Sequence, residues 1–342
     1  MSAVETLPFG RAINAGLRRA MERDEKVLLM GEDIGTLGGV FRITDGLIDT
    51  FGPDRVVDTP LAESGIVGTA IGLTYAGYRP VCEIQFDGFV FPAYDQITTQ
   101  LAKLRYRTAG AHAAPVVIRI PYGGGIGAIE HHSESPEALF AHTAGLRVIS
   151  PASPADAYVM IQQAIASPDP VLFFEPKARY WDKGPVPTGA SDAELGIAGT
   201  EITDFGNEQM QSARVVCEGT DATIVGYGPT VRTAMMTAEV AAEEGTELEV
   251  IDLRSISPID FDVVTSSVRK TGRLVVTHEA PVFFGPGAEI AARVSEECFY
   301  FLEAPVQRVG GFHTPYPVSK IEDDYLPGLD RLLHAVETSM AY

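Results

Sequence analysis

The sequence predicts an α/β protein with two units of mostly parallel sheet covered by helices on both faces. Short apolar runs alternate with longer helical patterns along most of the 342 residues. The apolar runs are nearly continuous, which is typical of strands buried on both faces of a parallel sheet. Between residues 182 and 211, Gly, Pro and acidic residues dominate instead. We therefore expect a larger domain over 1–181, a linker over 182–211 and a smaller domain over 212–342.

In the first unit, helical spacing and strand-like runs follow one another. Phe9, Ile13, Leu17 and Met21 recur every four residues and predict a helix over 8–23. The strands expected after it are KVLLMGED, RVVDTP, RPVCEIQF, APVVIRIP, LRVISP and DPVLFFEP. The helices expected between them include FPAYDQITTQLAKLRYR, with a basic end, and ADAYVMIQQAIAS. The segment SGIVGTAIGLTYAGY is too long for a strand and apolar nearly all round, so we expect a buried helix.

The second unit repeats the alternation on a smaller scale. The strands that we expect are ATIVGYG, LEVIDLR, RLVVTHEA and PVQRVGG. Helices are expected after the first strand up to Glu244, near DFDVVTSSVRKTG, and from GAEIAARVSEECF. The order of strands and helices is typical of parallel βαβ units.

Composition and charge exclude several classes of protein. The net charge of −20 argues against a nucleic-acid partner, which needs clustered positive charge to meet phosphate. No stretch approaches the ~18 apolar residues of a membrane helix, and the N-terminus does not resemble a signal peptide. The three cysteines are far apart, which disfavours a disulfide framework or a zinc site. We therefore expect a cytoplasmic protein without a nucleic-acid or membrane partner.

One carboxylate, Glu63, lies in DTPLAESG at the entrance of the apolar segment. A carboxylate near a buried helix must be paired, hydrogen-bonded or protonated. One interpretation is a capping residue satisfied by backbone N–H groups, which is the commoner use of such a position. The other is a carboxyl group that donates a proton to a ligand nitrogen. The local sequence leaves both open.

A glycine-rich stretch, PYGGGIGAIEHHSESPE, carries two adjacent histidines, His131 and His132. Glycines allow backbone conformations that other residues avoid, so this loop could bring a histidine to a ligand as acid or base. An exposed loop with incidental histidines is the alternative. A metal site is less favoured, because adjacent histidines point in different directions. A second glycine motif, GYGPT, lacks the third glycine of a dinucleotide fingerprint and predicts only a tight turn.

Several longer blocks occur in one order along residues 5–330. They are GED, DTPLAESGIVGTAIGL, EIQFDGFVFPAYDQI, HHSESPEALFAHTAGLRVISP, FFEPK, VIDLRSISPID, SVRKTGRLVVTHEAP and APVQRVGGFHTPYP. Together they resemble the beta subunit of the thiamine diphosphate-dependent 2-oxo acid dehydrogenases, the decarboxylating component of those complexes. The resemblance implies an N-terminal pyrimidine-binding domain and a C-terminal transketolase-like domain. The segment over 182–211 fits the family poorly.

The resemblance assigns a cofactor role to four residues. Glu63 matches the glutamate that hydrogen-bonds the ring nitrogen of the aminopyrimidine of thiamine diphosphate. Leu61 and Gln85 match positions that line the pyrimidine. Phe89 matches an aromatic position, often tyrosine, that packs on this ring.

The resemblance also selects between the two histidines. His132 matches the histidine of an HSQS-like motif, which handles the reaction intermediate and the incoming lipoyl group. His131 stands where an aromatic residue is common and ranks second. Glu134 replaces the usual glutamine of the motif.

The chain lacks the GDG motif with which such enzymes hold Mg2+ and the diphosphate. The resemblance therefore implies an alpha subunit that supplies this half of the site, in an assembly of two alpha and two beta chains. The acyl group would pass to the lipoyl domain of an acyltransferase core. A structural potassium ion is also implied, at backbone carbonyls near Val116, Val117, Ala164, Ser167 and Asp169.

The resemblance implies that the substrate is a small 2-oxo acid. Blocks such as FVFPAYDQI, HHSESPEALFAH, THEAP and EECF resemble branched-chain enzymes more than pyruvate enzymes, so we expect a branched-chain 2-oxo acid, with pyruvate as the alternative. Two rivals come from other classes: a transketolase-type enzyme active by itself, and a non-catalytic α/β scaffold subunit. The missing GDG disfavours the first, and the second predicts that Glu63 is dispensable.

Overall fold

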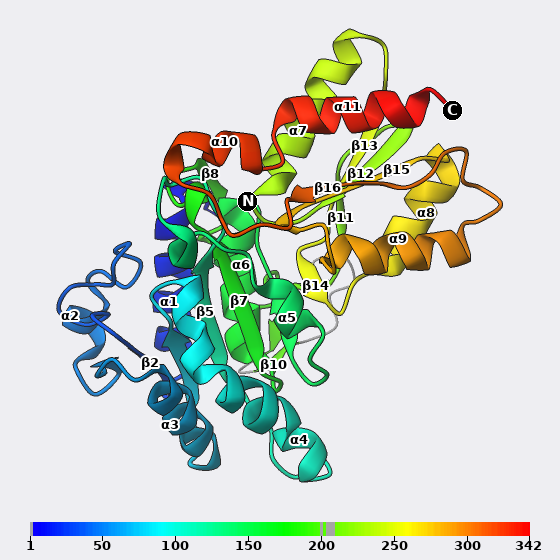
Figure 1. Cartoon of the computed structure of the whole chain (residues 1–342). Helices are drawn as coiled ribbons and strands as arrows, with labels where there is room; N and C mark the ends of the chain where they lie inside the picture. The colour runs from blue at the N-terminus through cyan, green and yellow to red at the C-terminus, as the bar shows by residue number, and fades with distance from the viewer. Residues whose placement is uncertain (1–2, 199–200, 203–208) are drawn as a thin grey trace.

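The computed structural model describes residues 3–198, 201–202 and 209–342. They form two α/β bodies that lie side by side (Figure 1). Each body has a mostly parallel sheet with helices packed against it, so the predicted fold class is confirmed. The larger body holds the N-terminal half of the chain, and the smaller holds most of the C-terminal half (Figure 1).

The larger sheet has seven strands in the order β14-β6-β7-β5-β4-β2-β3. Its strands are β2 (Val27–Gly31), β3 (Val56–Asp58), β4 (Arg79–Glu83), β5 (Val117–Tyr122), β6 (Arg147–Ile149), β7 (Val171–Pro176) and β14 (Ser255–Ser257). All neighbouring pairs are parallel except β14 with β6. β2, β5 and β7 are buried along their whole length, as their continuous apolar sequences predict.

Two long helices, α1 (Phe9–Arg23) and α6 (Pro154–Ala166), pack together beside this sheet. The predicted stripe of Phe9, Ile13, Leu17 and Met21 is buried, which confirms the helix expected over 8–23. Gly16 marks the close approach of the two helices. A Cβ at this position would lie 2.5 Å from Ile161 Cγ2, so no larger residue fits without a shift.

The helix expected from Phe91 to Arg107 is broken into short pieces. They are a 3-10 turn over Asp87–Ala93, a π turn over Gln96–Gln100, a 3-10 turn over Leu101–Lys103, and α4 (Leu104–Arg107). The first piece contains Pro92, which has no N–H to donate within a helix. Other short helices of this body are α2 (Leu47–Phe51), α5 (Glu137–Ala141) and the 3-10 turns Glu130–His132 and Lys177–Arg179.

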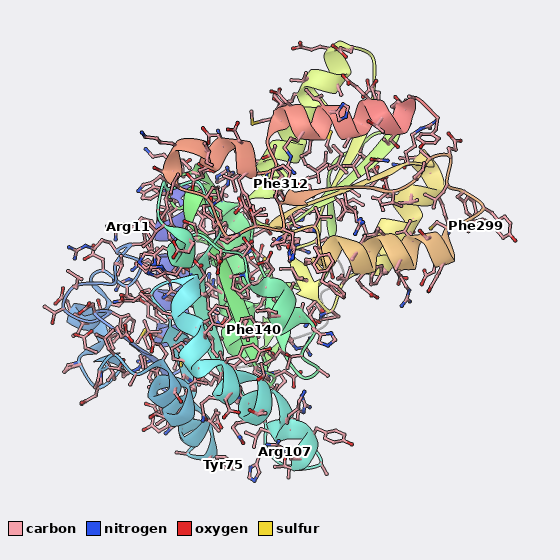
Figure 2. All side chains as sticks on the ribbon, viewed as in Figure 1. Arg11, Tyr75, Arg107, Phe140, Phe299 and Phe312 are labelled. Atoms are coloured by element: carbon pink, nitrogen blue, oxygen red, sulfur yellow. The ribbon has the colours of Figure 1, made fainter. Side chains whose placement is uncertain are left out.

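The apolar segment after Glu63 forms α3 (Glu63–Tyr75), but this helix is not buried all round. Only Ile66, Val67 and Ala70 are buried, whereas Tyr75 near its end is 55% exposed. Figure 2 shows Tyr75 at the outer end of this helix, in the lower part of the molecule. The expectation of a buried helix is therefore wrong for the chain alone, because the elements that contact it, β4 and the turns over Asp87–Ala93 and Gln96–Gln100, leave most of its residues partly exposed.

The smaller sheet has five strands in the order β11-β13-β12-β15-β16. They are β11 (Arg214–Cys217), β12 (Ala222–Gly226), β13 (Leu248–Asp252), β15 (Leu274–Pro281) and β16 (Gln307–Gly311). Helices α7 (Thr230–Glu243) and α11 (Leu329–Met340) lie on one side of it, and α8 (Phe261–Thr271) and α9 (Pro286–Glu297) on the other (Figure 1). The sequence did not predict α11 or the antiparallel edge strand β11.

The two bodies are joined by more than a linker. β14, from the C-terminal half, completes the larger sheet by pairing with β6. One buried apolar cluster runs through both bodies and includes Ile118 and Phe174 of the first and Val276 and Ile290 of the second. A short 3-10 turn (Ser319–Ile321) and α10 (Glu322–Tyr325) of the C-terminal half lie over the larger body (Figure 1). The interface is therefore part of the core.

The first part of the segment expected as a linker packs on the larger body. β8 (Lys183–Val186) pairs with β1 (Glu5–Pro8), and Asp192 forms ion pairs with Arg19 and Arg23 of α1. Farther on, β9 (Ile197–Ala198) pairs with β10 (Glu201–Ile202). Residues 199–200 and 203–208 lie outside the described residues. The domain limits at 181 and 212 stay a prediction.

Within the described ranges, none of the helices has the length and apolar character that crossing a membrane requires.

Candidate functional site

The predicted site residues follow strands that end at one edge of the larger sheet. Leu61 and Glu63 come after β3, Gln85 comes after β4, and the glycine loop comes after β5. Because these strands are parallel, their carboxyl ends meet at the same edge. Ligands of open α/β sheets bind in the crevice outside the carboxyl ends of the strands.

Glu63 is the first residue of α3 and is half-buried. The N-cap residue of this helix is Ala62, and no side chain caps it. In the part of the chain that the structure describes, no hydrogen bond or ion pair engages the Glu63 carboxylate. The geometry therefore gives the capping interpretation no support. It leaves a carboxylate at a helix N-terminus, where negative charge is favoured.

Glu32 was not among the site residues predicted from the sequence. Its side chain is 4% exposed, and neither carboxylate oxygen has a hydrogen-bond partner among the described residues. Burial, followed by the negative charges of Glu63 and Asp33, raises the pKa of Glu32 to about 7. A buried carboxyl that titrates near neutrality is typical of functional sites. The sequence signal that could have identified Glu32 is the GED block, which ends the buried strand β2 at the same sheet edge as Glu63.

Gln85 lies next to Glu32, and Phe89 lies next to the two histidines. The Gln85 amide donates to the backbone oxygen of Glu32 and to Asp33 Oδ2, both at 3.4 Å. The Phe89 ring lies in the short turn after β4, with its centroid 5.2 Å from that of His132 and 6.1 Å from that of His131. The fold thus brings a flat aromatic ring and the histidine pair together.

The two histidines differ in their surroundings. The His132 ring stacks on Phe86 with a centroid distance of 4.0 Å and an interplanar angle of 14°, and its Nδ1 is buried without a partner in the described part of the chain. The His131 side chain is 46% exposed, and its Nδ1 lies 3.5 Å from Glu130 Oε1. His132 therefore has a fixed ring and a free nitrogen, which supports ranking it first.

A buried ion pair lies beneath the histidine loop. Lys177 Nζ contacts Asp87 Oδ1 at 2.6 Å, and both side chains are inaccessible to solvent. The other Asp87 oxygen accepts the backbone N–H of Glu134 at 2.9 Å. Burial raises the pKa of Asp87 to about 6, although the Lys177 charge opposes the shift. The pair fixes the backbone just after His132.

Gly88 also constrains this loop. A Cβ at position 88 would lie 2.3 Å from the backbone oxygen of His131, closer than real Cβ contacts come. The histidine backbone therefore packs directly on a glycine that follows β4. This contact explains why the glycine is required in the FDGF block.

The residues at this edge fit one half of thiamine diphosphate. An aromatic ring, an 80%-exposed Leu61, the Gln85 amide and the Glu63 carboxylate suit a flat aminopyrimidine with a ring nitrogen. No group of three or more His, Cys, Asp or Glu side chains within the described residues is placed to hold a metal ion. The fit therefore covers the pyrimidine and not the Mg2+-bound diphosphate.

The backbone oxygens expected to bind potassium are poorly suited to a cation. The backbone oxygen of Val116 accepts the N–H of Val171 at 2.9 Å, and that of Ala164 accepts the N–H of Ser167 at 3.2 Å. The Arg79 guanidinium lies 3.5 Å from the Ser167 oxygen and brings positive charge to this place. The geometry thus gives potassium little support, and the site at Val116, Val117, Ala164, Ser167 and Asp169 stays a prediction.

Two α/β bodies with a carboxylate and histidine site at the carboxyl edge of the larger sheet define a transketolase-like protein. Family models agree: residues 5–182 match "Transketolase, pyrimidine binding domain" and residues 211–332 match "Transketolase, C-terminal domain". The chain belongs to this family, and within it to the beta subunits of the 2-oxo acid dehydrogenases, as the curated relatives show.

Two of these relatives carry different substrate names. The "Pyruvate dehydrogenase E1 component subunit beta" of Leifsonia xyli is 59% identical over 99% of this chain and 96% of its own length. The "3-methyl-2-oxobutanoate dehydrogenase subunit beta" of Mycobacterium tuberculosis is 51% identical over 97% of this chain and 92% of its own length. Both types are therefore similar to this chain, and the similarity does not distinguish the branched-chain type from the pyruvate type.

A solved structure supports the fold alone. The "Split gene transketolase, inactive beta4 tetramer" aligns over 98% of each chain with a TM-score of 0.75 and 22% sequence identity. The two-domain architecture thus extends to chains that are distant in sequence.

Proposed function

We propose that this chain is the catalytic beta subunit of a 2-oxo acid dehydrogenase that decarboxylates its substrate on thiamine diphosphate and passes the acyl group to a lipoyl domain. The observation that carries the proposal is the position of Glu63. Its carboxylate begins α3 and lies near the buried carboxyl of Glu32, which has no hydrogen-bond partner among the described residues. Membership of the transketolase family implies dependence on thiamine diphosphate. When bound, this cofactor supplies an electron sink for decarboxylation.

Each residue of this chain has a distinct task in the proposal. Glu63 hydrogen-bonds the pyrimidine ring nitrogen and sets the proton distribution of that ring. Glu32, which titrates near pH 7, adjusts the negative charge beside Glu63. Phe89 and Leu61 cover the ring and exclude water, and Gln85 orients its edge. His132 uses its free Nδ1 to hold or move a proton when the lipoyl group arrives.

An alpha subunit supplies the rest of the site in this proposal, including Mg2+ and the diphosphate contacts. Two features support it: the partly exposed apolar helix α3 beside Glu63, and the absence of a metal-binding cluster from the described residues. The names of the relatives, "subunit beta", point the same way. We further propose two alpha with two beta chains, a lipoyl-bearing acyltransferase core as partner, and a cytoplasmic location.

The substrate experiment compares 2-oxo acids on the co-expressed alpha–beta complex with thiamine diphosphate and Mg2+. We propose the branched-chain acids, as their sequence blocks predict, with pyruvate as the alternative that a 59% identical relative favours. The kcat/KM values for pyruvate and for the oxo acids of valine, leucine and isoleucine decide between them. A preference for pyruvate rejects the branched-chain proposal and leaves the family proposal standing.

The role of Glu63 is tested with Glu63→Gln in the same complex. We expect decarboxylation to fall about 10²–10³-fold, the usual cost of losing one contact made to the activated state, while the assembly still forms. Glu296→Gln, an exposed site on α9, is the matched control and should retain full rate. Near-normal decarboxylation in Glu63→Gln would favour the non-catalytic scaffold instead.

A further inference from the structure

The glycine loop ahead of the histidines is bound by two carboxylates from the C-terminal half of the chain. Glu279, in β15, accepts the backbone N–H of Gly124 at 2.8 Å. Glu322, at the start of α10, accepts the N–H groups of Gly125 and Gly127 through its two oxygens, each at 3.0 Å. Both carboxylates are buried. Three backbone donors of one loop therefore point at side chains more than 150 residues away in the sequence.

The backbone of this loop is shaped for these acceptors. Gly123, Gly125 and Gly127 have φ values of 78°, 85° and 69°, in the left-handed region that favours glycine. Successive N–H groups in such a conformation form a concave site for negative charge. Here the site is filled from within the chain, so the glycines are explained without an external anion.

A tyrosine fixes the second carboxylate. The Tyr316 hydroxyl donates to Glu322 Oε1 at 2.7 Å. The same hydroxyl packs so closely on the loop that a Cβ at Gly124 would lie 1.8 Å from it. Glu322 thus has three donors, two from the loop and one from its own half of the molecule, and its orientation is set before any ligand binds.

The histidine pair lies between this attachment and a second one. On the far side, Asp87 holds the N–H of Glu134, and the Tyr227 hydroxyl donates to Glu137 Oε1 at 2.6 Å. Between the two attachments, the rings of His131 and His132 pack on each other and on Phe86 and Phe89. Within the described residues, they have no other aromatic neighbour. The position of His132 therefore depends on how both ends of its loop are held.

We propose that Glu322, supported by Glu279 and Tyr316, is a positioning residue through which the C-terminal domain sets the place of His132. The proposal rests on the proposed function of His132 in acyl transfer. A reacting group misplaced by about 1 Å can lose 10²-fold in rate, so a glycine-rich loop that carries such a group needs a restraint of this kind. The restraint acts on the loop and does not touch the pyrimidine side of the site.

The first test follows loop exchange, which needs no activity. In the assembled alpha–beta complex, hydrogen–deuterium exchange of residues 123–132 is compared between wild type, Glu322→Gln and Asp323→Asn. An amide can accept only with its oxygen, so Glu322→Gln should speed exchange in this peptide about 10-fold or more. Asp323→Asn removes the same charge from the next, exposed residue and should leave exchange unchanged. Equal exchange in Glu322→Gln and wild type would overturn the proposal.

The second test separates the two half-reactions of the same complex. Decarboxylation is followed with an artificial electron acceptor, and acyl transfer with a free lipoyl domain. We expect Glu322→Gln to lower transfer about 10–100-fold and decarboxylation much less. Equal losses in both, as from general damage to the fold, would count against positioning.

Two further variants complete the test. Tyr316→Phe controls for a folding defect, and His132→Ala separates the role of Glu322 from the role of His132. Tyr316→Phe keeps the Glu322 carboxylate and removes one of its donors, so it should show the same split with a smaller loss. His132→Ala should lower transfer whatever the loop does. If His132→Ala transfers normally, the proposed role of His132 fails, while the exchange result still reports on the restraint. If only His132→Ala lowers transfer, the positioning role of Glu322 fails.

Discussion

Two groups of carboxylates in this molecule have opposite surroundings. At the sheet edge, Glu32 is buried without a hydrogen-bond partner among the described residues, and Glu63 starts a helix that it does not cap. At the seam between the two bodies, Glu279, Glu322 and Glu137 each accept a hydrogen bond from a backbone N–H or a tyrosine hydroxyl. The carboxylates of the first region lack hydrogen-bond donors, whereas those of the second region have them.

The difference shows how to distinguish a carboxylate that stabilises the fold from one that takes part in a reaction. Burial without donors costs free energy, and a fold keeps such a group only where something else needs it. A buried carboxylate that accepts hydrogen bonds holds the segments that donate them in place. We therefore expect variants at the engaged positions to change stability, and variants at the sheet edge to change chemistry or ionisation while the fold persists.

The largest effect is expected for Lys177→Met, which breaks the buried pair with Asp87. An uncompensated buried charge costs about 3–5 kcal/mol, so the free energy of unfolding in urea at pH 7.5 should fall by this amount. The double variant with Asp87→Asn should recover part of the loss, because the asparagine oxygen can still accept the Glu134 N–H. A Lys177→Met chain as stable as wild type would show that the pair does not hold the loop.

The next effect concerns the pH dependence of stability and Glu137. Burial raises the pKa of Glu137 to about 7 from an ordinary 4.5. Its contribution to stability is thus fully present below pH 4.5 and is lost as the pH rises through 7. Glu137→Gln keeps an acceptor for Tyr227 and removes the titration, so relative to wild type it should gain about 3 kcal/mol between pH 4.5 and 8.

The Glu137 prediction is measured by urea unfolding of both chains across this pH range. Glu32 and Glu279 also have pKa values raised to about 7, so the wild-type curve contains their contributions as well. The difference between the two curves isolates Glu137. A parallel pair of curves would mean that the carboxyl is ionised normally in the fold.

The smallest effect is an ionisation change at the sheet edge. Glu63→Gln removes a negative neighbour and should lower the pKa of Glu32 from about 7, while burial, the larger cause, keeps it above 4.5. Carbon-13 NMR of labelled glutamate carboxyls follows this titration in the single chain. The same variant should leave the urea midpoint nearly unchanged. An unaltered Glu32 titration would show that the two carboxyls do not interact.

The strands and the first helix could be predicted because their evidence is local. The four-residue spacing of Phe9, Ile13, Leu17 and Met21 defines a buried face, and runs such as VLLMG admit only a buried strand. The family blocks also singled out Glu63 and His132, which follow strands that end at the carboxyl edge of the sheet; their roles stay a prediction. The prediction was wrong for the helix after Glu63. An apolar composition indicates that a helix surface is buried, but it does not tell whether the same chain or another chain buries it.

By itself, the sequence determined two α/β units, the family, and the residues at the ends of the central strands, because periodicity and motif order are properties of neighbouring residues. Tertiary structure alone decided which side chains find donors. It left Glu32 with no donor among the residues that the structure describes, and it placed Glu322 on Gly125 and Gly127, almost 200 residues away. Hydrogen bonding and desolvation depend on what the fold brings within about 3 Å, and no local pattern encodes that distance.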